Sequence, residues 1–181
     1  MSMDSRRDDI QGGRLDRALV TAGHLLTLVG ALDPLEGSLL VLPGCVLVAV
    51  AAWRLSLPRR VRHYRVVVAL LAVFGVSALW LISGAGGIGG RGGLPLTWAL
   101  LSLPYPVALV ASFSGPAAPP WVPWSGCAVG AIYLALAAFI LWRPRLHSGL
   151  DVVALLAALG LAIVVACTAR IRQRRRGATS G

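Results

Sequence analysis

The sequence has no lysine and little charge of any kind. Only 13% of its 181 residues are charged, whereas a soluble domain usually carries about 25%, and 57% are hydrophobic. This apolar excess is too large for one soluble core and predicts that lipid surrounds much of the chain. All 17 basic residues are arginine, which, with abundant alanine, glycine and proline, is typical of a GC-rich bacterial genome.

Cysteine is scarce and scattered. Cys45, Cys127 and Cys167 each lie within or at the end of an apolar run, without CxxC spacing or a nearby histidine. The pattern argues against a disulfide framework or zinc site and favours three small buried thiols. No serine–histidine–aspartate set or nucleophile elbow is visible. We therefore expect no metal, no cofactor and no enzymatic activity.

Long apolar runs dominate the rest of the chain. There are six, at residues 18–32, 35–53, 66–83, 94–113, 127–142 and 150–169. Several approach the ~20 residues that cross a bilayer core. We predict an all-α, polytopic membrane bundle of about six transmembrane helices at 18–169, between an N-terminal tail at 1–17 and a basic C-terminal tail at 170–181. The fourth run contains Pro104 and Pro106, so a five-span model with a re-entrant fourth segment is the main competitor.

The arginines favour six spans and fix the orientation. In that model the N-terminal tail, second loop and C-terminal tail share one side and carry every arginine except Arg91, Arg143 and Arg145. The positive-inside rule then places both termini in the cytoplasm and the protein in the inner membrane. The expected partner of the basic segments is the anionic cytoplasmic leaflet, and we expect no nucleic-acid partner.

The densest polar cluster of the predicted outer side is the turn at 33–38. Asp33, Pro34 and Glu36 fit an N-cap, a first helical residue and a third helical residue, which is a capping box for the second span. The alternative is a cation or proton site built from the two carboxylates. Arg91, the only charged residue of the glycine-rich loop at 84–93, is expected on the same side and could pair with either carboxylate.

His24 is the ionisable residue deepest in a predicted span. Thr21 and Thr27 lie on roughly the same side of the helix. Intramembrane ionisable groups are functional candidates. The structural alternative is a neutral histidine bonded to a neighbouring helix.

Small residues mark two predicted packing surfaces. Gly126 and Gly130 form a G-x-x-x-G motif that opens the fifth span. The sixth span carries an alanine stripe, one small residue every four positions, which consists of Ala154, Ala158, Ala162 and Ala166. Because such residues let helix backbones approach closely, we expect both to pack against other helices, within the chain or in a homo- or hetero-oligomer.

Three short segments carry a family resemblance. The letters DPLEGS at 33–38, GGIGG at 86–90 and LPYP at 103–106, with apolar spans between them, resemble a loosely defined group of small, uncharacterised bacterial multi-pass membrane proteins. The resemblance covers residues 18–113. It implies a shared outer-face feature and no particular activity.

We expect a non-enzymatic accessory or assembly component of a membrane. The missing catalytic sets and the packing signals favour that hypothesis. A small transporter or channel is the alternative, and its candidate polar groups are His24, Asp33 and Glu36. The near absence of other polar residues that could line a path argues against it.

Overall fold

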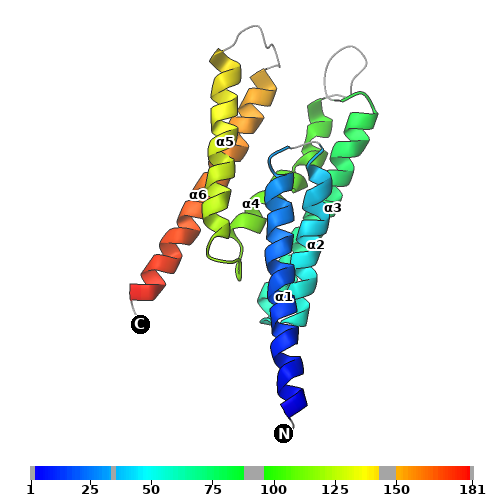
Figure 1. The fold of residues 1–181 in the computed structure, drawn as a ribbon. Helices are drawn as coiled ribbons and strands as arrows, with labels where there is room; N and C mark the ends of the chain where they lie inside the picture. The colour runs from blue at the N-terminus through cyan, green and yellow to red at the C-terminus, as the bar shows by residue number, and fades with distance from the viewer. Residues whose placement is uncertain (1–2, 34–35, 88–95, 143–149, 180–181) are drawn as a thin grey trace. The chain divides into compact units, whose positions relative to one another are not determined.

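The structure, a computed structural model, describes residues 3–33, 36–87, 96–142 and 150–179. Within these residues it contains helices and no strand, which confirms the all-α prediction. The elements are α1 (Met3–Gly30), α2 (Ser38–Arg54), α3 (Arg59–Gly84), the 3-10 helix η1 (Leu96–Ser102), α4 (Pro104–Ser114), α5 (Val122–Trp142) and α6 (Leu150–Thr179) (Figure 1). The chain divides into two compact units, Met1–Ala108 and Leu109–Gly181.

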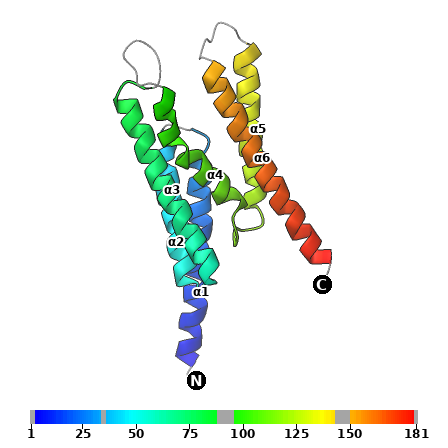
Figure 2. The same ribbon diagram turned by 180° about the vertical axis from the view of Figure 1, so that it is seen from behind.

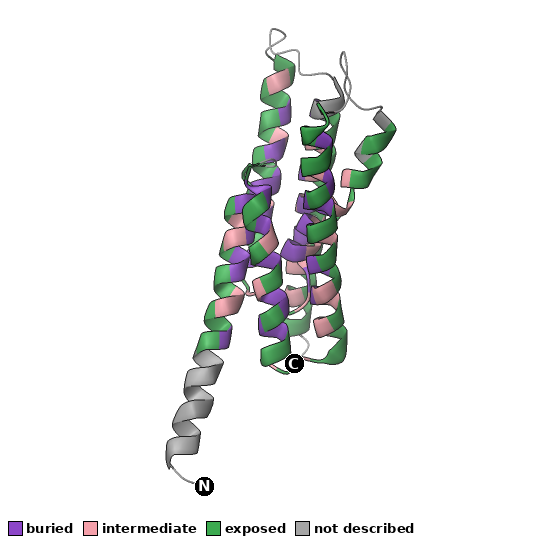
Figure 3. Cartoon of the chain, turned by 90° about the vertical axis from the view of Figure 1, so that its right-hand side faces the viewer, coloured by how far each residue is buried: buried purple, intermediate pink, exposed green. Residues whose placement is uncertain are grey.

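The helices are apolar on their outer faces as well as their inner ones. Leu70, Phe74 and Leu81 on α3 are 62%, 56% and 75% exposed. Exposed residues run along the outward faces of the helices in Figure 3. A helix that is hydrophobic all round is typical of a membrane span. Among the described residues, three helices are long and apolar enough to cross a membrane: Arg59–Gly84, Val122–Trp142 and Val153–Ala178.

In the first unit, α1 and α2 pack as an antiparallel pair through glycines. Gly23 faces Gly44, and Gly30 faces Gly37. A Cβ atom on Gly23 would lie 2.7 Å from the Gly44 carbonyl oxygen, which is too close for any side chain. The two helix backbones are therefore in direct contact at these positions.

Helix α3 completes the first unit beside α2 (Figure 2). Its buried residues, which include Val68, Ala72, Gly75 and Val76, recur every three or four positions and form one helical face. At the middle of α3, Gly75 lies against the backbone of Tyr105, where a Cβ atom would be 2.6 Å from the Tyr105 Cα. This contact holds the start of α4 against α3.

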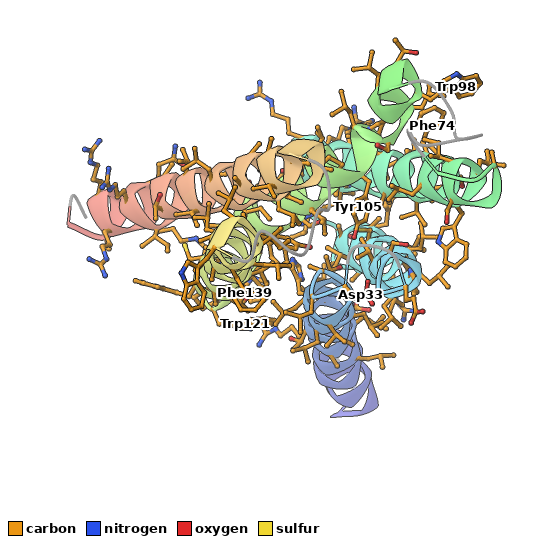
Figure 4. All side chains as sticks on the ribbon, turned by 90° about the horizontal axis from the view of Figure 1, so that it is seen from above. Asp33, Phe74, Trp98, Tyr105, Trp121 and Phe139 are labelled. Carbon is orange, nitrogen blue, oxygen red and sulfur yellow. The ribbon has the colours of Figure 1, made fainter. Side chains whose placement is uncertain are left out.

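The predicted fourth span is broken in two. Residues 96–102 form η1, and α4 begins at Pro104, so the break coincides with the LPYP segment. Trp98 of η1 lies near Phe74 of α3 (Figure 4), and both line an apolar pocket of about 450 Å³. The prolines lack backbone N–H groups, which explains why a continuous α-helix does not form here.

The second unit is built on an antiparallel hairpin of α5 and α6. Gly130 and Gly160 face each other, and a Cβ on Gly130 would lie 2.7 Å from the Gly160 carbonyl oxygen. Gly126 lies under the Cys167 sulfur and the Phe113 ring. Val129, Tyr133 and Ile163 fill the rest of the interface, each at most 2% exposed.

Several helices extend beyond the predicted apolar runs. Helix α1, which contains the first predicted span, begins at Met3, and α6, which contains the sixth, continues to Thr179, so both tails are helical where described. The third helix begins at Arg59, inside the segment 59–65 that the sequence suggests is a loop. The turn between α2 and α3 is correspondingly short, and Ser56 adopts a left-handed conformation there, with φ of 49°.

Candidate functional site

The turn between α1 and α2 is stabilised locally. The Glu36 N–H donates to Asp33 Oδ1 at 3.3 Å, and both residues are exposed. Helix α2 begins at Ser38, however, with Gly37 as its N-cap residue and no side-chain cap. The interpretation of Asp33 as the N-cap is therefore wrong.

The reason lies in the glycine contact between α1 and α2. A Cβ on Gly37 would collide with the carbonyl oxygens of Gly30 and Asp33, so the backbone at Gly37 is in direct contact with the end of α1. Helix α2 begins only after this contact. Pro34, the predicted first helical residue, lies outside the described residues, as do Arg91 and its predicted pairing with Asp33 or Glu36. That pairing stays a prediction.

His24 lies in the interior of the first unit. It is 1% exposed, and its Nδ1 is 2.8 Å from the Val20 carbonyl oxygen one turn earlier in α1. Thr27, 2% exposed, shares the buried face and donates to the Gly23 carbonyl oxygen at 2.9 Å. Thr21 is exposed and so does not belong to this buried polar face. The proximity of His24 and Thr27 agrees with the expected grouping, and its functional role stays a prediction.

A polar cluster that sequence reasoning missed lies at the arginine-rich end of the first unit. Asp16 is 8% exposed, and Arg54 Nε lies 2.8 Å from its Oδ1. Arg65, on the neighbouring α3, is 3% exposed. We call Asp16, Arg54, Arg62 and Arg65 the inner cluster. Burial of charged groups at these positions requires the compensation that the Asp16–Arg54 pair provides.

Arg62 connects the inner cluster to an aromatic ring. Its guanidinium carbon lies 4.7 Å from the centroid of the Trp53 ring, a cation–π contact. Its Nε atom is buried and has no hydrogen-bond partner among the described residues. Arg54 and Arg62 together carry more positive charge than the Asp16 carboxylate balances. The arrangement is suited to attract an anion rather than to transfer protons.

One signal in the sequence points to this cluster. Asp16, Gly23 and Gly30 recur every seven residues along α1, as Gly37, Gly44 and Ala51 do along α2. Residues seven apart share a helix face, so the buried Asp16 continues the glycine face toward the N-terminal end of α1. Reading Asp16 as part of a solvated tail overlooked this repeat.

The two predicted packing motifs have different environments. Gly126 and Gly130 are buried against α6. On α6 itself Ala154, Ala158 and Ala162 are exposed and Ala166 is half-buried. The alanine stripe therefore lies on a face of α6 that α5 does not use, and its packing against another helix stays a prediction. The contact with α5 uses Gly160, which lies about 200° around the helix from Ala158.

The basic end of α6 contacts the loop before α5. Arg174 Nη2 donates to the Ala118 carbonyl oxygen at 2.6 Å, and Nη1 donates to that of Pro119 at 3.4 Å. Arg175 lies over the Trp124 ring, 5.8 Å from its centroid. The arginine run thus fastens the α4–α5 loop in addition to any role at a membrane surface.

The thiols contribute to packing in both units. Cys45 and Cys167 are buried and Cys127 is half-buried, and all three are free. Cys127 on α5 and Cys167 on α6 lie close enough for their thiols to interact. Within the described residues, no three histidine, cysteine or acidic side chains gather in a way that could hold a metal ion.

Comparison with known proteins gives no relative. No family model, curated protein or solved structure matches the chain.

Proposed function

We propose that this chain is a non-enzymatic integral membrane protein that serves as an accessory or assembly component. The observation that carries the proposal is the alanine stripe of α6. It offers small residues at four-residue spacing on a face that α5 does not use. Between helices in a membrane, such a face permits close contact with another helix, from a second copy or a different protein.

The proposal includes six spans with both termini in the cytoplasm of a bacterial cell, in the inner membrane. Three helices meet the criteria for a span, and α2, with 17 residues, is about 26 Å long against a core of ~30 Å. By length alone, η1 and α4 add about 14 Å and 17 Å, which supports a broken fourth span. In α1, the Asp16–Arg54 pair reduces the cost of charge near the apolar segment.

The arginine distribution supports the orientation. Arg54 ends α2 and Arg59 begins α3, so both lie at one turn, and the run at 170–176 ends α6. An even number of spans places these segments on the same side as the N-terminus. The glycine-rich segment 84–93 is then external.

The assembly proposal is tested by co-purification in a mild detergent. The double variant Ala158→Leu, Ala162→Leu fills the stripe with branched side chains. Its matched control, Ala131→Leu, Ala135→Leu, makes the same change at two exposed positions of α5 with the same spacing. We expect the wild type and the control to retain a protein partner or a second copy, and the stripe variant to lose it at unchanged thermal stability. Equal retention by all three would contradict the proposal.

A small transporter or channel is the second candidate. Asp16, His24, Thr27 and Arg65 are buried polar residues within the first unit, and the fourth span is interrupted, as in transporters whose discontinuous helices form binding sites. Substrate-dependent flux in proteoliposomes that His24→Ala abolishes, without loss of folding, would favour this candidate.

A further inference from the structure

An apolar groove runs along the surface of the first unit, between α2 and α3. Its volume is about 400 Å³. It extends over nine residues of α2, about 12 Å along the helix axis, which fits within the ~15 Å depth of one leaflet. Its walls are aliphatic side chains, among them Val46, Ala49 and Val50 from α2 and Ala69, Leu70 and Val73 from α3.

At its inner end the groove meets positive charge. Trp53 and Arg54 belong to its lining, and Arg62 lies over the Trp53 ring. The Arg54 side chain is 52% exposed, and its ion pair with Asp16 is made through Nε, while its two Nη groups carry four further N–H donors. Arg62 Nε is buried, and its guanidinium adds positive charge beside the Trp53 ring. Arg54 thus offers donors for an anion at the inner end of the apolar groove.

We propose that the groove and these two arginines bind one anionic phospholipid of the cytoplasmic leaflet. One acyl chain lies in the groove, the phosphate accepts hydrogen bonds from Arg54 at its inner end, and the Arg62 guanidinium over Trp53 adds electrostatic attraction. The indole of Trp53 lies between the acyl chain and the phosphate, at the depth of the membrane interface that aromatic rings favour. The inference rests on the proposed membrane placement and does not depend on the assembly role.

The combination of features selects a lipid over other occupants. A soluble phosphate would use the arginines and leave the aliphatic groove empty. An apolar partner helix would cover the aliphatic walls and leave the arginine donors at the inner end without an anion. A phospholipid satisfies both parts at once, because its phosphate and acyl chain are covalently joined.

The proposal is tested by native mass spectrometry of the delipidated protein in detergent. Phosphatidylglycerol and phosphatidylcholine with identical acyl chains are titrated separately. We expect one phosphatidylglycerol to bind with at least about tenfold preference. The variant Arg54→Gln, Arg62→Gln should lose the preference, and Arg172→Gln, Arg176→Gln, which removes the same charge from α6, should keep it. Equal preference in both double variants would overturn the proposal.

Two further variants separate charge, groove and folding. Arg62→Gln alone leaves the Asp16–Arg54 pair intact, so it should weaken binding without loss of thermal stability. Val50→Trp, at a position 45% exposed, fills the groove and leaves the arginines in place. It should reduce phosphatidylglycerol binding, and soluble glycerol phosphate should not displace the lipid from the wild type. Unchanged binding by Val50→Trp, or displacement by glycerol phosphate, would overturn the role of the groove.

The outcomes are independent of the assembly proposal. The Ala158→Leu, Ala162→Leu variant, whose changes lie on α6, should bind phosphatidylglycerol as the wild type does. Failure of assembly with intact lipid preference would reject only the proposed function, and the reverse result would reject only the lipid site.

Discussion

In the first unit, arginine side chains are packed among the helices, whereas in the second they follow the last apolar turns of α6. Arg65 is 3% exposed and Arg54 pairs with the buried Asp16. Arg174, by contrast, bonds to loop carbonyls at the end of the hairpin. Both units nevertheless bring their antiparallel helices together through facing glycines. Facing glycines thus bring the helices together in both units. The units differ in where their arginine side chains lie.

The largest expected loss of stability comes from disrupting the glycine contacts that both units share. Gly23→Leu in the first unit and Gly130→Leu in the second each force a side chain into a backbone contact. We expect each to lower the free energy of unfolding by about 3 kcal/mol, because neither helix pair can separate without losing its interface. The measurement is thermal or denaturant unfolding in detergent.

Gly177→Leu is the control for these glycine variants. It lies in α6, and a Cβ there would meet nothing within 4 Å. Its stability should match the wild type. If Gly23→Leu and Gly130→Leu were as stable as this control, the close glycine contacts would not exist.

A smaller loss of stability is expected when the buried charge that only the first unit uses among its described helices is removed. Asp16→Asn removes the carboxylate that faces Arg54. The expected loss is about 1–2 kcal/mol, between the values for an exposed and a buried ion pair, because Asp16 is buried and Arg54 is half exposed. Asp33→Asn is the control, since its amide oxygen can still accept the Glu36 N–H at an exposed site. Equal stability of the two variants would mean that Asp16 is solvated.

The smallest effect concerns the second unit. Arg174→Gln removes two hydrogen bonds to the α4–α5 loop and should cost about 1 kcal/mol or less, because the site is partly exposed. Chymotrypsin should cleave after Trp121 faster in this variant. Arg172→Gln, which alters an exposed residue, should be cleaved at the wild-type rate. Identical cleavage of both variants would show that Arg174 does not hold the loop.

The helices were predictable from the sequence because their signal is long and repeated. The apolar runs located every helix, and the LPYP segment located the break before α4. The ends of the helices were less predictable. The arginine-rich segments at the start of α3 and the end of α6 are helical, but arginine does not add to the apolar signal by which the helices were located. A helix end depends on local hydrogen bonds, as the shift of the N-cap from Asp33 to Gly37 illustrates.

The candidate sites were predictable only where the relevant pattern lies within one helix. Gly126 and Gly130 were found because four-residue spacing is visible in a single segment. The inner cluster was not, because Asp16, Arg54 and Arg62 belong to three helices and meet only after α1, α2 and α3 have packed. The spacing of the alanine stripe likewise predicts a packing face within one helix, and it does not identify which helix that face contacts.

The number of membrane spans is the central claim, and the location of the C-terminus tests that number directly. A reporter that is active only in the cytoplasm is fused after Gly181, and one that is active only outside is inserted within 84–93. Six spans predict that both reporters are active. An inactive reporter at Gly181, with activity restored by the external reporter at that position, would contradict the account and favour five spans.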